Sequence, residues 1–459
     1  MSLGRHQERI EPRDIILANE SSFQSPVSDG PNSDTEQLFR NEKDPHKSGL
    51  EVASFNYVNS IIGSGVIGIP YAFKEAGFGL GIMMLAFVAL VTDYSLVLMV
   101  RSAHLSGVYS YQGLMEAAFG SAGFIILSFL QFIYPFIAMV SYNIVVGDTI
   151  TKVLMRVFNL YPHSLLARRD VVVALATIFV TLPLCLMKNL AGLAKASILS
   201  MVFVFFILLA IFIRFFTLQD VVPPSFDAWE FANWDVIPAL GIMAFAFMCH
   251  HNVFLLYESI ERADQTKWDK ITHFSLSISF AISAMFGVAG YATFTGYSQG
   301  DLLENYCWDD DLMNLARLFF SCTILFTYPI ECLVTRSVIY QVMGNENNVS
   351  DLQHLLITCG IVGTTFLLSI MTDCLGVVLE LNGVLSAVPL AFILPAASYL
   401  KLEPGSVFSD RKLPALGLAI FGCLVAVIGA VLIVLDFDSV DTCSHGRVMP
   451  YCLNHTLYT

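Results

Sequence analysis

Two short stretches of the sequence place helix-breaking and polar residues inside apolar runs, and these stretches could do chemistry. The first, "NSIIGSGVIGIP", begins at Asn59 and contains Gly63, Ser64 and Gly65. Glycine and proline disfavour helix interiors, so a helix through this stretch should be interrupted. Backbone N–H groups at the start of its second half would favour an anion such as a carboxylate. Carbonyl groups released at the end of its first half, that of Ile62 among them, would favour a hard cation.

The second stretch, "FAFMCHHNVFLLYESI", puts Cys249, His250, His251 and Asn252 next to one another in an apolar run. Polar and ionisable residues inside such a run are costly in lipid and usually mark functional positions. His250 could line a ligand pocket or sense pH, because its ordinary pKa is about 6.5. A hydrogen-bonded structural histidine is an equally good interpretation of His250, and we interpret His251 as structural.

Plain structural roles for these residues remain open. Glycines often serve only to let membrane helices pack closely, and Asn59 could hydrogen-bond to a neighbouring helix. Phe245 and Phe247 could form the apolar side of a ligand pocket, although packing in a Phe-rich core is the commoner role. The presence of two interruptions, in the first and the sixth apolar run, favours a site, because this is the spacing expected of two inverted repeats of five helices.

The composition shows what kind of molecule must position these stretches. Of 459 residues, 56% are hydrophobic and only 14% are charged, with a mean hydropathy of +0.67, whereas soluble domains are about a quarter charged. Continuous apolar runs of about 20 residues favour membrane-spanning helices over a membrane barrel. We therefore expect an all-α integral membrane protein with eleven transmembrane helices. The runs cover residues 51–74, 79–101, 121–155, 171–187, 191–216, 236–257, 271–296, 312–336, 352–372, 375–400 and 414–436.

The chain divides into three parts by composition. Residues 1–48 are polar and contain no apolar run, which predicts a disordered tail. No secretory signal pattern is recognisable there, so we expect this tail in the cytosol. Residues 49–436 form the transmembrane domain, and residues 437–459 form a short extracellular or luminal tail.

The distribution of Lys and Arg also indicates a cytosolic N-terminus. With the N-terminus inside, ten basic residues fall in inner segments and six in the tail, which makes sixteen of the twenty-four. The outer connections 217–235 and 297–311 contain neither Lys nor Arg. Cytoplasmic segments are enriched in these residues, so we expect the N-terminus inside and the C-terminal tail outside.

The expected outer tail carries possible modification sites. Asn454 begins the glycosylation sequon "NHT", and Cys443 and Cys452 could form a disulfide in an oxidising compartment. Cys307 is a third cysteine on that side, so the pairing stays open. The other seven cysteines, Cys185, Cys322 and Cys359 among them, are interpreted as packing residues.

Other classes of function are poorly supported. Acidic residues spread over the tail and outer loops account for the net charge of −14 as solvated surface, and no nucleic-acid partner is indicated. An enzyme is not expected, because adjacent residues such as "CHH" fan around a helix and provide no nucleophile, base and orienting group together. The same stretch has too few ligands for zinc, and we expect no cofactor. Glu331 and Glu380 lie within spans, so each should face the interior and have a polar partner.

Four segments carry a resemblance to a known family. "NSIIGSGVIGIPYAFKEAGFGLGI", "FAFMCHHNVFLLYESI", "GYATF" at 290–294 and "FILPAASYLKL" at 392–402 resemble the sodium-coupled neutral amino acid transporters of the amino acid/auxin permease superfamily. The resemblance spans 51–436. His251 stands where the family usually has proline, so the chain is identified as a divergent member.

The resemblance implies a leucine-transporter-like fold, with a 5+5 inverted repeat and broken first and sixth helices. In that family an asparagine before the first break governs sodium interaction and matches Asn59, and a threonine two residues before a proline in the eighth helix matches Thr327. Thr323 lies one turn earlier and could add a hydroxyl. These residues and Ile62 form the expected sodium site, and Gly63, Ser64, Gly65, Phe245, Phe247 and His250 form the expected substrate site.

The expected function is sodium-coupled symport of neutral amino acids by alternating access, with sodium as a co-transported ligand. One alternative is proton coupling through His250 or an acid. Another is an amino acid sensor with little flux that signals to a cytosolic partner through the N-terminal tail. We expect a multi-pass protein in the lipid bilayer of the plasma membrane, with the lysosomal membrane as the alternative.

Overall fold

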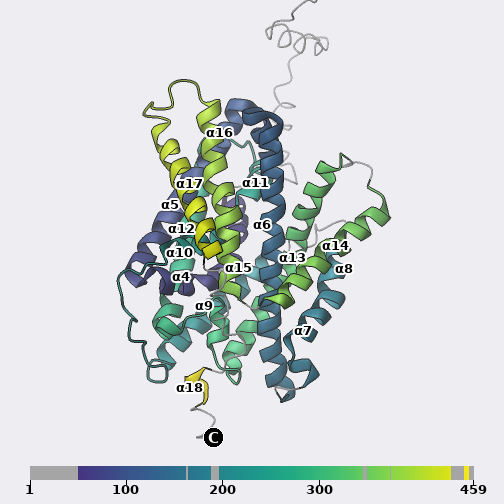
Figure 1. Ribbon diagram of the computed structural model, residues 1–459, viewed down its shortest axis with the longest axis vertical. Coiled ribbons are helices and arrows are strands. Elements are labelled where there is room, and N and C mark those ends of the chain that lie inside the picture. Colours follow the sequence, from purple (N-terminus) through teal and green to yellow (C-terminus); the bar gives the residue numbers. More distant parts are fainter. Residues whose placement is uncertain are drawn as a thin grey trace, which may run out of the picture. The chain divides into compact units, whose positions relative to one another are not determined.

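The computed structural model describes residues 50–161, 164–187, 196–344, 349–372, 374–435 and 449–453, and every regular element among them is helical (Figure 1). The expected tail 1–48, Cys443 and Asn454 lie outside the described residues. The helices, including short 3-10 and π-helical turns labelled η, are α3 (Leu50–Ile61), η1 (Ser64–Gly68), α4 (Ile69–Ala76), α5 (Phe78–Ser106), α6 (Tyr111–Phe158), η2 (Leu165–Ala167), α7 (Arg169–Ala176), η3 (Thr177–Thr181), α8 (Leu182–Leu186), α9 (Ala196–Thr217), α10 (Val236–Ala246), η5 (His250–Asn252), α11 (Val253–Glu258), α12 (Gln265–Phe294), η6 (Thr295–Tyr297), η7 (Leu302–Asn305), α13 (Asp311–Val342), α14 (Asp351–Met371), α15 (Leu375–Asn382), η8 (Gly383–Ala387), η9 (Pro389–Ile393), α16 (Leu394–Leu402), α17 (Leu413–Leu435) and α18 (Pro450–Leu453).

Ten helical segments among the described residues are long and apolar enough to cross a membrane. The predicted class, an all-α integral membrane protein, is therefore confirmed. The predicted first span, 51–74, is not among the ten, because its interruption divides it into the short helices α3 and α4. The third apolar run belongs to the 48-residue helix α6, which turns at Gly120, where φ is 65° and a residue without a side chain is favoured.

The first helix is interrupted where the sequence predicts. α3 ends at Ile61, and the chain continues through an extended Gly63 (φ −121°, ψ −154°) into η1 and α4. Gly65 lies against the end of α10, since a Cβ atom built on it would lie 2.6 Å from Cα of Ala246. Pro70 falls in the first turn of α4, where its missing N–H is tolerated.

The sixth helix is interrupted as well, although no glycine or proline marks the position. α10 ends at Ala246, the backbone leaves the helix at Phe247 (φ −99°, ψ 6°) and Cys249 (φ −139°, ψ 6°), and η5 leads into α11. η1 packs against α10, so the two interruptions lie side by side. Figure 1 shows α4 and α10 next to each other.

Small residues allow α10 to approach the α15 segment very closely. A Cβ atom built on Gly383 of η8 would lie 1.9 Å from the carbonyl oxygen of Gly241 in α10. Membrane helices commonly use glycine for such contacts, because dispersion between close backbones stabilises them in lipid. On the other side of the molecule α6 packs along α13, where the Thr149 and Ser321 hydroxyl oxygens are 2.6 Å apart.

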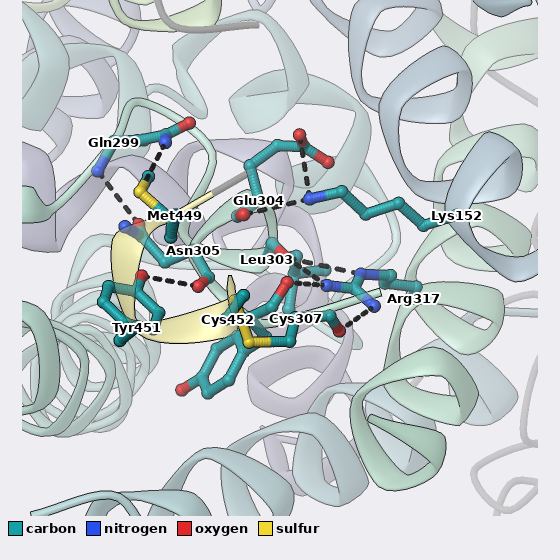
Figure 2. Close-up of a disulfide and its surroundings, with 11 residues drawn as sticks. Lys152, Gln299, Leu303, Glu304, Asn305, Cys307, Arg317, Met449, Tyr451 and Cys452 are labelled. Atoms are coloured by element: carbon teal, nitrogen blue, oxygen red, sulfur yellow. Dashed lines mark hydrogen bonds and ion pairs between the residues drawn. A yellow bond between two sulfur atoms is a disulfide. The ribbon is translucent and has the colours of Figure 1, made fainter. Parts of the chain in front are cut away.

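One end of the molecule is covered by the loop 298–310, which connects α12 to α13 and is held by α18 (Figure 2). Cys307 in this loop is disulfide-bonded to Cys452 of α18, with their Cα atoms 5.6 Å apart. The Tyr451 hydroxyl donates to the Asn305 carbonyl at 2.7 Å, and its ring stacks on that of Phe294. These contacts place Cys452 against the loop. We refer to this part of the molecule as the disulfide end.

The structure corrects three of the predictions made for cysteines. The proposed pairing of Cys443 with Cys452 is wrong, because α18 packs on the 298–310 loop and brings Cys452 to Cys307. Cys374 is also disulfide-bonded, so it is not a simple packing residue. Cys185 and Cys322 carry free thiols within helices, as predicted, whereas the free Cys359 lies on the exposed face of α14 rather than in a packed interior.

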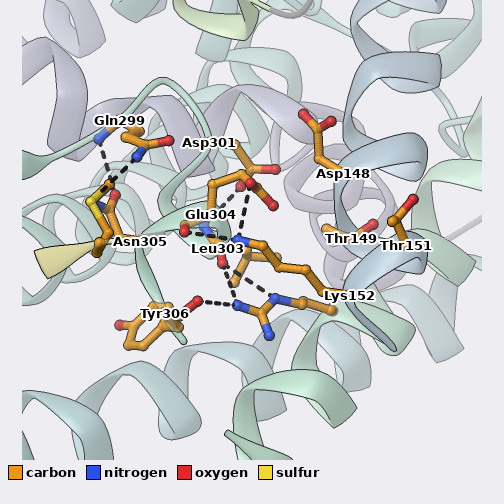
Figure 3. Close-up of polar contacts among 12 residues, drawn as sticks. Asp148, Thr149, Thr151, Lys152, Gln299, Asp301, Leu303, Glu304, Asn305 and Tyr306 are labelled. Carbon is orange, nitrogen blue, oxygen red and sulfur yellow. Dashed lines mark hydrogen bonds and ion pairs between the residues drawn. The ribbon is translucent and has the colours of Figure 1, made fainter. Parts of the chain in front are cut away.

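Charged groups fix the same loop to the transmembrane helices (Figure 3). Lys152 of α6 reaches the Glu304 carboxylate at 3.0 Å and donates to the Glu304 carbonyl at 2.9 Å. The fully buried Arg317 of α13 donates to the carbonyl oxygens of Leu303 and Tyr306. η7 within this loop packs on η1, so the loop covers the first helix interruption from the disulfide end.

Asp301 is the buried acid of this loop. Its Oδ1 atom accepts a hydrogen bond from the backbone N–H of Leu303 at 2.8 Å. Burial, and next the charge of Glu304, raise the pKa of Asp301 to about 8. The folded chain therefore holds this proton more tightly than the unfolded chain, in which an aspartate pKa is about 3.9. The stability that Asp301 contributes is complete below pH about 4 and is lost as the pH rises to about 8.

Asp301→Asn should flatten the pH dependence of unfolding. Asparagine keeps an acceptor for the Leu303 N–H but cannot ionise, so the fall in melting temperature between pH 5 and pH 8 should be smaller in this variant than in the wild type. Thermal melts of the purified protein over this pH range measure the effect. Asp220→Asn, which removes an exposed acid, serves as the control. Parallel curves for the wild type and Asp301→Asn would contradict this assignment.

Candidate functional site

A cavity of about 380 Å³ lies between the two helix interruptions. It is bounded by the α3–η1 segment, by the α10–α11 segment and by residues of α6, α9 and α13. The volume falls within the range of about 300–1,000 Å³ that is usual for small-molecule sites. The predicted site residues that line it are Asn59, Ile62, Gly63, Ser64, Gly65, Phe245 and Thr327.

Two residues predicted to form the substrate site lie elsewhere. His250 is fully buried, and its Nε2 atom lies 3.2 Å from the Ser95 hydroxyl of α5, on the side away from the cavity. Phe247 is buried in the core and does not line the cavity. The backbone leaves the helix at Phe247, so helical spacing does not describe the side-chain directions that follow. The interpretation of both residues as pocket residues is therefore wrong.

His251, interpreted from the sequence as structural, lines the cavity instead. Its ring centroid lies 5.5 Å from that of Tyr134 on α6. Its buried Nδ1 atom has no hydrogen-bond partner among the residues that the structure describes. A histidine in this position can donate or accept a hydrogen bond to a ligand, depending on its tautomer.

The two threonines of α13 differ in their surroundings. Thr327 lines the cavity, and its hydroxyl donates to the carbonyl of Thr323 at 2.9 Å, so the oxygen can still accept or coordinate. Thr323 does not line the cavity, and its hydroxyl donates to the Phe319 carbonyl at 3.1 Å. Both lie on one face of the helix, as predicted, but only Thr327 is open to the cavity.

The cavity also contains residues that the sequence did not mark as its lining. Tyr134 and Tyr142 come from α6, a helix for which the sequence predicted no site residue. Glu331 comes from α13, one turn after Thr327, and is only 7% exposed. Its interior position agrees with the prediction. The predicted polar partner is not found, since its Oε2 atom makes no hydrogen bond to any residue that the structure describes.

A hydrogen bond between side chains that line the cavity links the two interrupted helices. The Asn252 side chain donates to the Ser60 hydroxyl at 3.0 Å, and both residues line the cavity. Leu255 of α11 also lines it, and its side chain is 74% exposed. In Figure 1, α11 lies away from α18, which marks the disulfide end, and η7 of the loop 298–310 packs on η1.

A protein-family model described as transmembrane amino acid transporter protein matches residues 46–435. The chain belongs to this family. As a member of the transmembrane amino acid transporter family it is a multi-pass membrane transporter and not an enzyme. The match covers both helix interruptions and every residue that lines the cavity.

Individual relatives agree with the family assignment. A Danio rerio protein with the name "Putative sodium-coupled neutral amino acid transporter 11" is 46% identical over 405 residues, which cover 88% of this chain and 90% of that protein. Vacuolar amino acid transporter 2 of Saccharomyces cerevisiae is 30% identical over 87% of this chain and 85% of its own length. A crystal structure of an Eremococcus coleocola manganese transporter mutant has a similar fold, with a TM-score of 0.53, 14% identity and coverage of 95% of this chain and 94% of that one.

Proposed function

We propose that this amino acid transporter is a sodium-coupled symporter of neutral amino acids that works by alternating access. The observation that carries the proposal is the cavity between two helix interruptions, which is lined by two glycines and by residues with hydroxyl, amide and carbonyl oxygens. The relative from Danio rerio is named for the same activity. In this proposal α3 and α4 form an eleventh, first span, and the first ten spans form two inverted repeats of five.

The substrate carboxylate binds at Ser64 and Gly65, at the positive end of the second half of the first helix. Phe245 and Tyr134, whose ring centroids are 5.7 Å apart, form an apolar wall for the substrate side chain. An aromatic wall with a few placed polar groups is the usual composition of a small-molecule site. None of the described residues that line the cavity is a lysine or an arginine, which fits an amino acid with a neutral side chain.

Sodium binds beside the substrate, between the first and the eighth span. Its oxygen ligands are the Asn59 side chain, the Ile62 carbonyl and the Thr327 hydroxyl, from two different helices. Unwound carbonyls and hydroxyl oxygens are suitable ligands for sodium in transporters with broken helices. Bound sodium holds the two helices together and completes the amino acid site, so the sodium gradient drives uptake.

The disulfide supports the expected orientation. Disulfides form in oxidising compartments, so the disulfide end faces the exterior or a lumen. We infer that the cavity is reached from the opposite side, beside α11, and that this conformation is an inward-open state; the 74% exposure of Leu255, which lines the cavity, supports this inference. In the outward-open state the loop 298–310 moves off η1 and the opening beside α11 closes.

We propose the plasma membrane as the site of action, with the N-terminal tail in the cytosol. The vacuolar assignment of the yeast relative makes an acidic organelle the alternative address. His251 and Glu331 are the titratable groups in the cavity that a proton-coupled mechanism would use. An amino acid sensor would use the same cavity but would move little substrate.

Uptake into proteoliposomes tests the proposal. Purified protein is reconstituted, and labelled neutral amino acids are supplied with sodium or choline outside at constant pH. The symporter requires sodium for uptake. Uptake that is independent of sodium and follows an imposed pH gradient would indicate proton coupling instead of sodium coupling. Binding of amino acid without uptake would favour the sensor.

Asn59→Ala and Thr327→Ala should each raise the sodium concentration for half-maximal uptake about tenfold. Each substitution removes one oxygen ligand, and a loss of about 1.4 kcal/mol corresponds to a factor of ten in affinity. Thr364→Ala, which removes an exposed hydroxyl of α14, is the matched control and should leave the sodium response unchanged. A normal sodium response in both cavity variants would contradict the proposed ion site.

A further inference from the structure

Glu331 is an acid in the cavity whose role the ion site proposed above does not include. It lies four residues after Thr327 on α13, so the two side chains share one face of the helix. Both line the cavity together with Asn59 and Ile62 of the first span. The carboxylate is therefore in the region where oxygen ligands from the first and eighth spans meet.

No positively charged side chain among the described residues neutralises this carboxylate. Glu331 is 7% exposed, it takes part in no ion pair, and its Oε2 atom has no hydrogen-bond partner within the described ranges. Two phenols of α6, those of Tyr134 and Tyr142, line the same cavity as Glu331. Buried cations of the adjacent helices have other partners: Lys152 with Glu304, Arg169 with Asp148, and Arg336 with Cys185 and Thr358.

A buried carboxylate without a counter-ion is costly, because it has lost hydration and gained nothing in return. The cavity must therefore supply either a proton or a bound cation to Glu331. The other polar ligands beside it are a hydroxyl, an amide and a backbone carbonyl, all oxygen donors that suit a hard cation. This set of ligands contains a single carboxylate, so it matches a monovalent ion better than a divalent one. The described residues contain no group of three or more His, Cys, Asp or Glu side chains that could hold a metal ion.

We propose that Glu331 is a direct ligand of the co-transported sodium ion and supplies the only negative charge of that site. This inference rests on the proposed sodium coupling and adds a ligand of a different kind. Asn59, Ile62 and Thr327 offer neutral oxygens, whereas Glu331 compensates the charge of the ion. Sodium binding then removes an uncompensated charge from the protein interior, so an empty ion site is electrostatically unfavourable. This gives the ion a stabilising effect that neutral ligands alone would not produce.

The proposal predicts opposite effects of Glu331→Gln with and without sodium. Glutamine has nearly the same shape but no charge, so in sodium-free buffer this variant should melt at a higher temperature than the wild type. Sodium should raise the melting temperature of the wild type, and the sodium concentration for half of this rise should increase at least about tenfold in Glu331→Gln. A residue with only a packing role would produce neither the sodium-free gain nor the loss of response.

The experiment uses the full-length purified chain at constant pH, with thermal melts over a sodium titration and choline replacing sodium to keep ionic strength fixed. Binding of a labelled neutral amino acid is measured on the same samples, both at the highest sodium concentration and with choline alone. Glu331→Asp keeps the charge and should recover part of the sodium response. Glu116→Gln, which neutralises an exposed acid of α6, is the control for loss of charge alone.

Each outcome decides a different question. A sodium response in Glu331→Gln equal to that of the wild type overturns the ligand assignment and leaves sodium coupling intact. If Glu331→Gln loses amino acid binding to the same extent with and without sodium, Glu331 is a substrate ligand. This outcome also overturns the assignment of Glu331 as a sodium ligand. A wild type that binds amino acid but shows no sodium response overturns the sodium coupling itself.

Discussion

Gly65→Val is expected to abolish most amino acid binding and uptake. A Cβ atom on Gly65 would lie 2.6 Å from Cα and 2.9 Å from Cβ of Ala246, which is closer than real Cβ contacts. Ala246 ends α10, so it can move only if the second helix interruption moves with it. Overpacking of this kind costs about 1–3 kcal/mol, and here the cost falls on the geometry of the site. Affinity should therefore fall about tenfold to a hundredfold.

Neighbouring glycines provide controls for this prediction. Nothing lies within 4 Å of a Cβ atom on Gly63, and its backbone is extended, so Gly63→Ala should melt at the wild-type temperature. Gly417→Ala on α17 also meets open space and should keep both stability and uptake. Equilibrium binding of labelled amino acid and initial uptake rates are compared among the three variants. Wild-type binding by Gly65→Val would show that the two interruptions do not need this close contact.

Loss of the Cys307–Cys452 disulfide is expected to cause the second large effect. The bond links residues 145 positions apart and fixes α18 to the loop that covers η1. Removal of a native disulfide commonly costs about 2–5 kcal/mol, with longer closed loops at the upper end in the chain-entropy account. Membrane insertion already restricts the intervening helices, so we expect a loss of about 2–3 kcal/mol, seen as a fall of several degrees in melting temperature.

Single and double variants test whether this effect comes from one bond. Cys307→Ser, Cys452→Ser and the double variant remove the same bond, so all three should lose about the same stability. Cys423→Ser, at an exposed free thiol of α17, should leave the melting temperature unchanged. A double variant that loses the sum of two single losses would show that the two cysteines act independently.

The sequence predicts those features that depend on local chemistry. Ten of the eleven apolar runs correspond to the ten long helices among the described residues, because lipid requires helices of about 20 apolar residues, and the first run corresponds to the short helices α3 and α4. Gly63 and Gly65 locate the first interruption, and the polar cluster from Cys249 to Asn252 locates the second. Both signals depend only on neighbours in the chain, so no knowledge of packing was needed.

Side-chain directions within the interruptions could not be predicted. Helical spacing does not apply after Phe247, and this reverses the positions of His250 and His251 relative to the cavity. Tyr134 and Tyr142 line the site because α6 packs along α13. The sequence of α6 alone does not predict which helix it contacts. The disulfide partner of Cys452 could not be predicted either, because it depends on how α18 packs against a loop that is distant in the sequence.

Sodium movement coupled to amino acid movement is the central claim, and a direct measurement is the influx of labelled sodium into proteoliposomes of the purified chain. A neutral amino acid is added outside at constant pH and with no initial sodium gradient. The account predicts that the amino acid gradient drives sodium inward in a fixed ratio to amino acid uptake, and that this coupled influx is lost in Thr327→Ala at low sodium. Amino acid uptake with no accompanying sodium influx would contradict it.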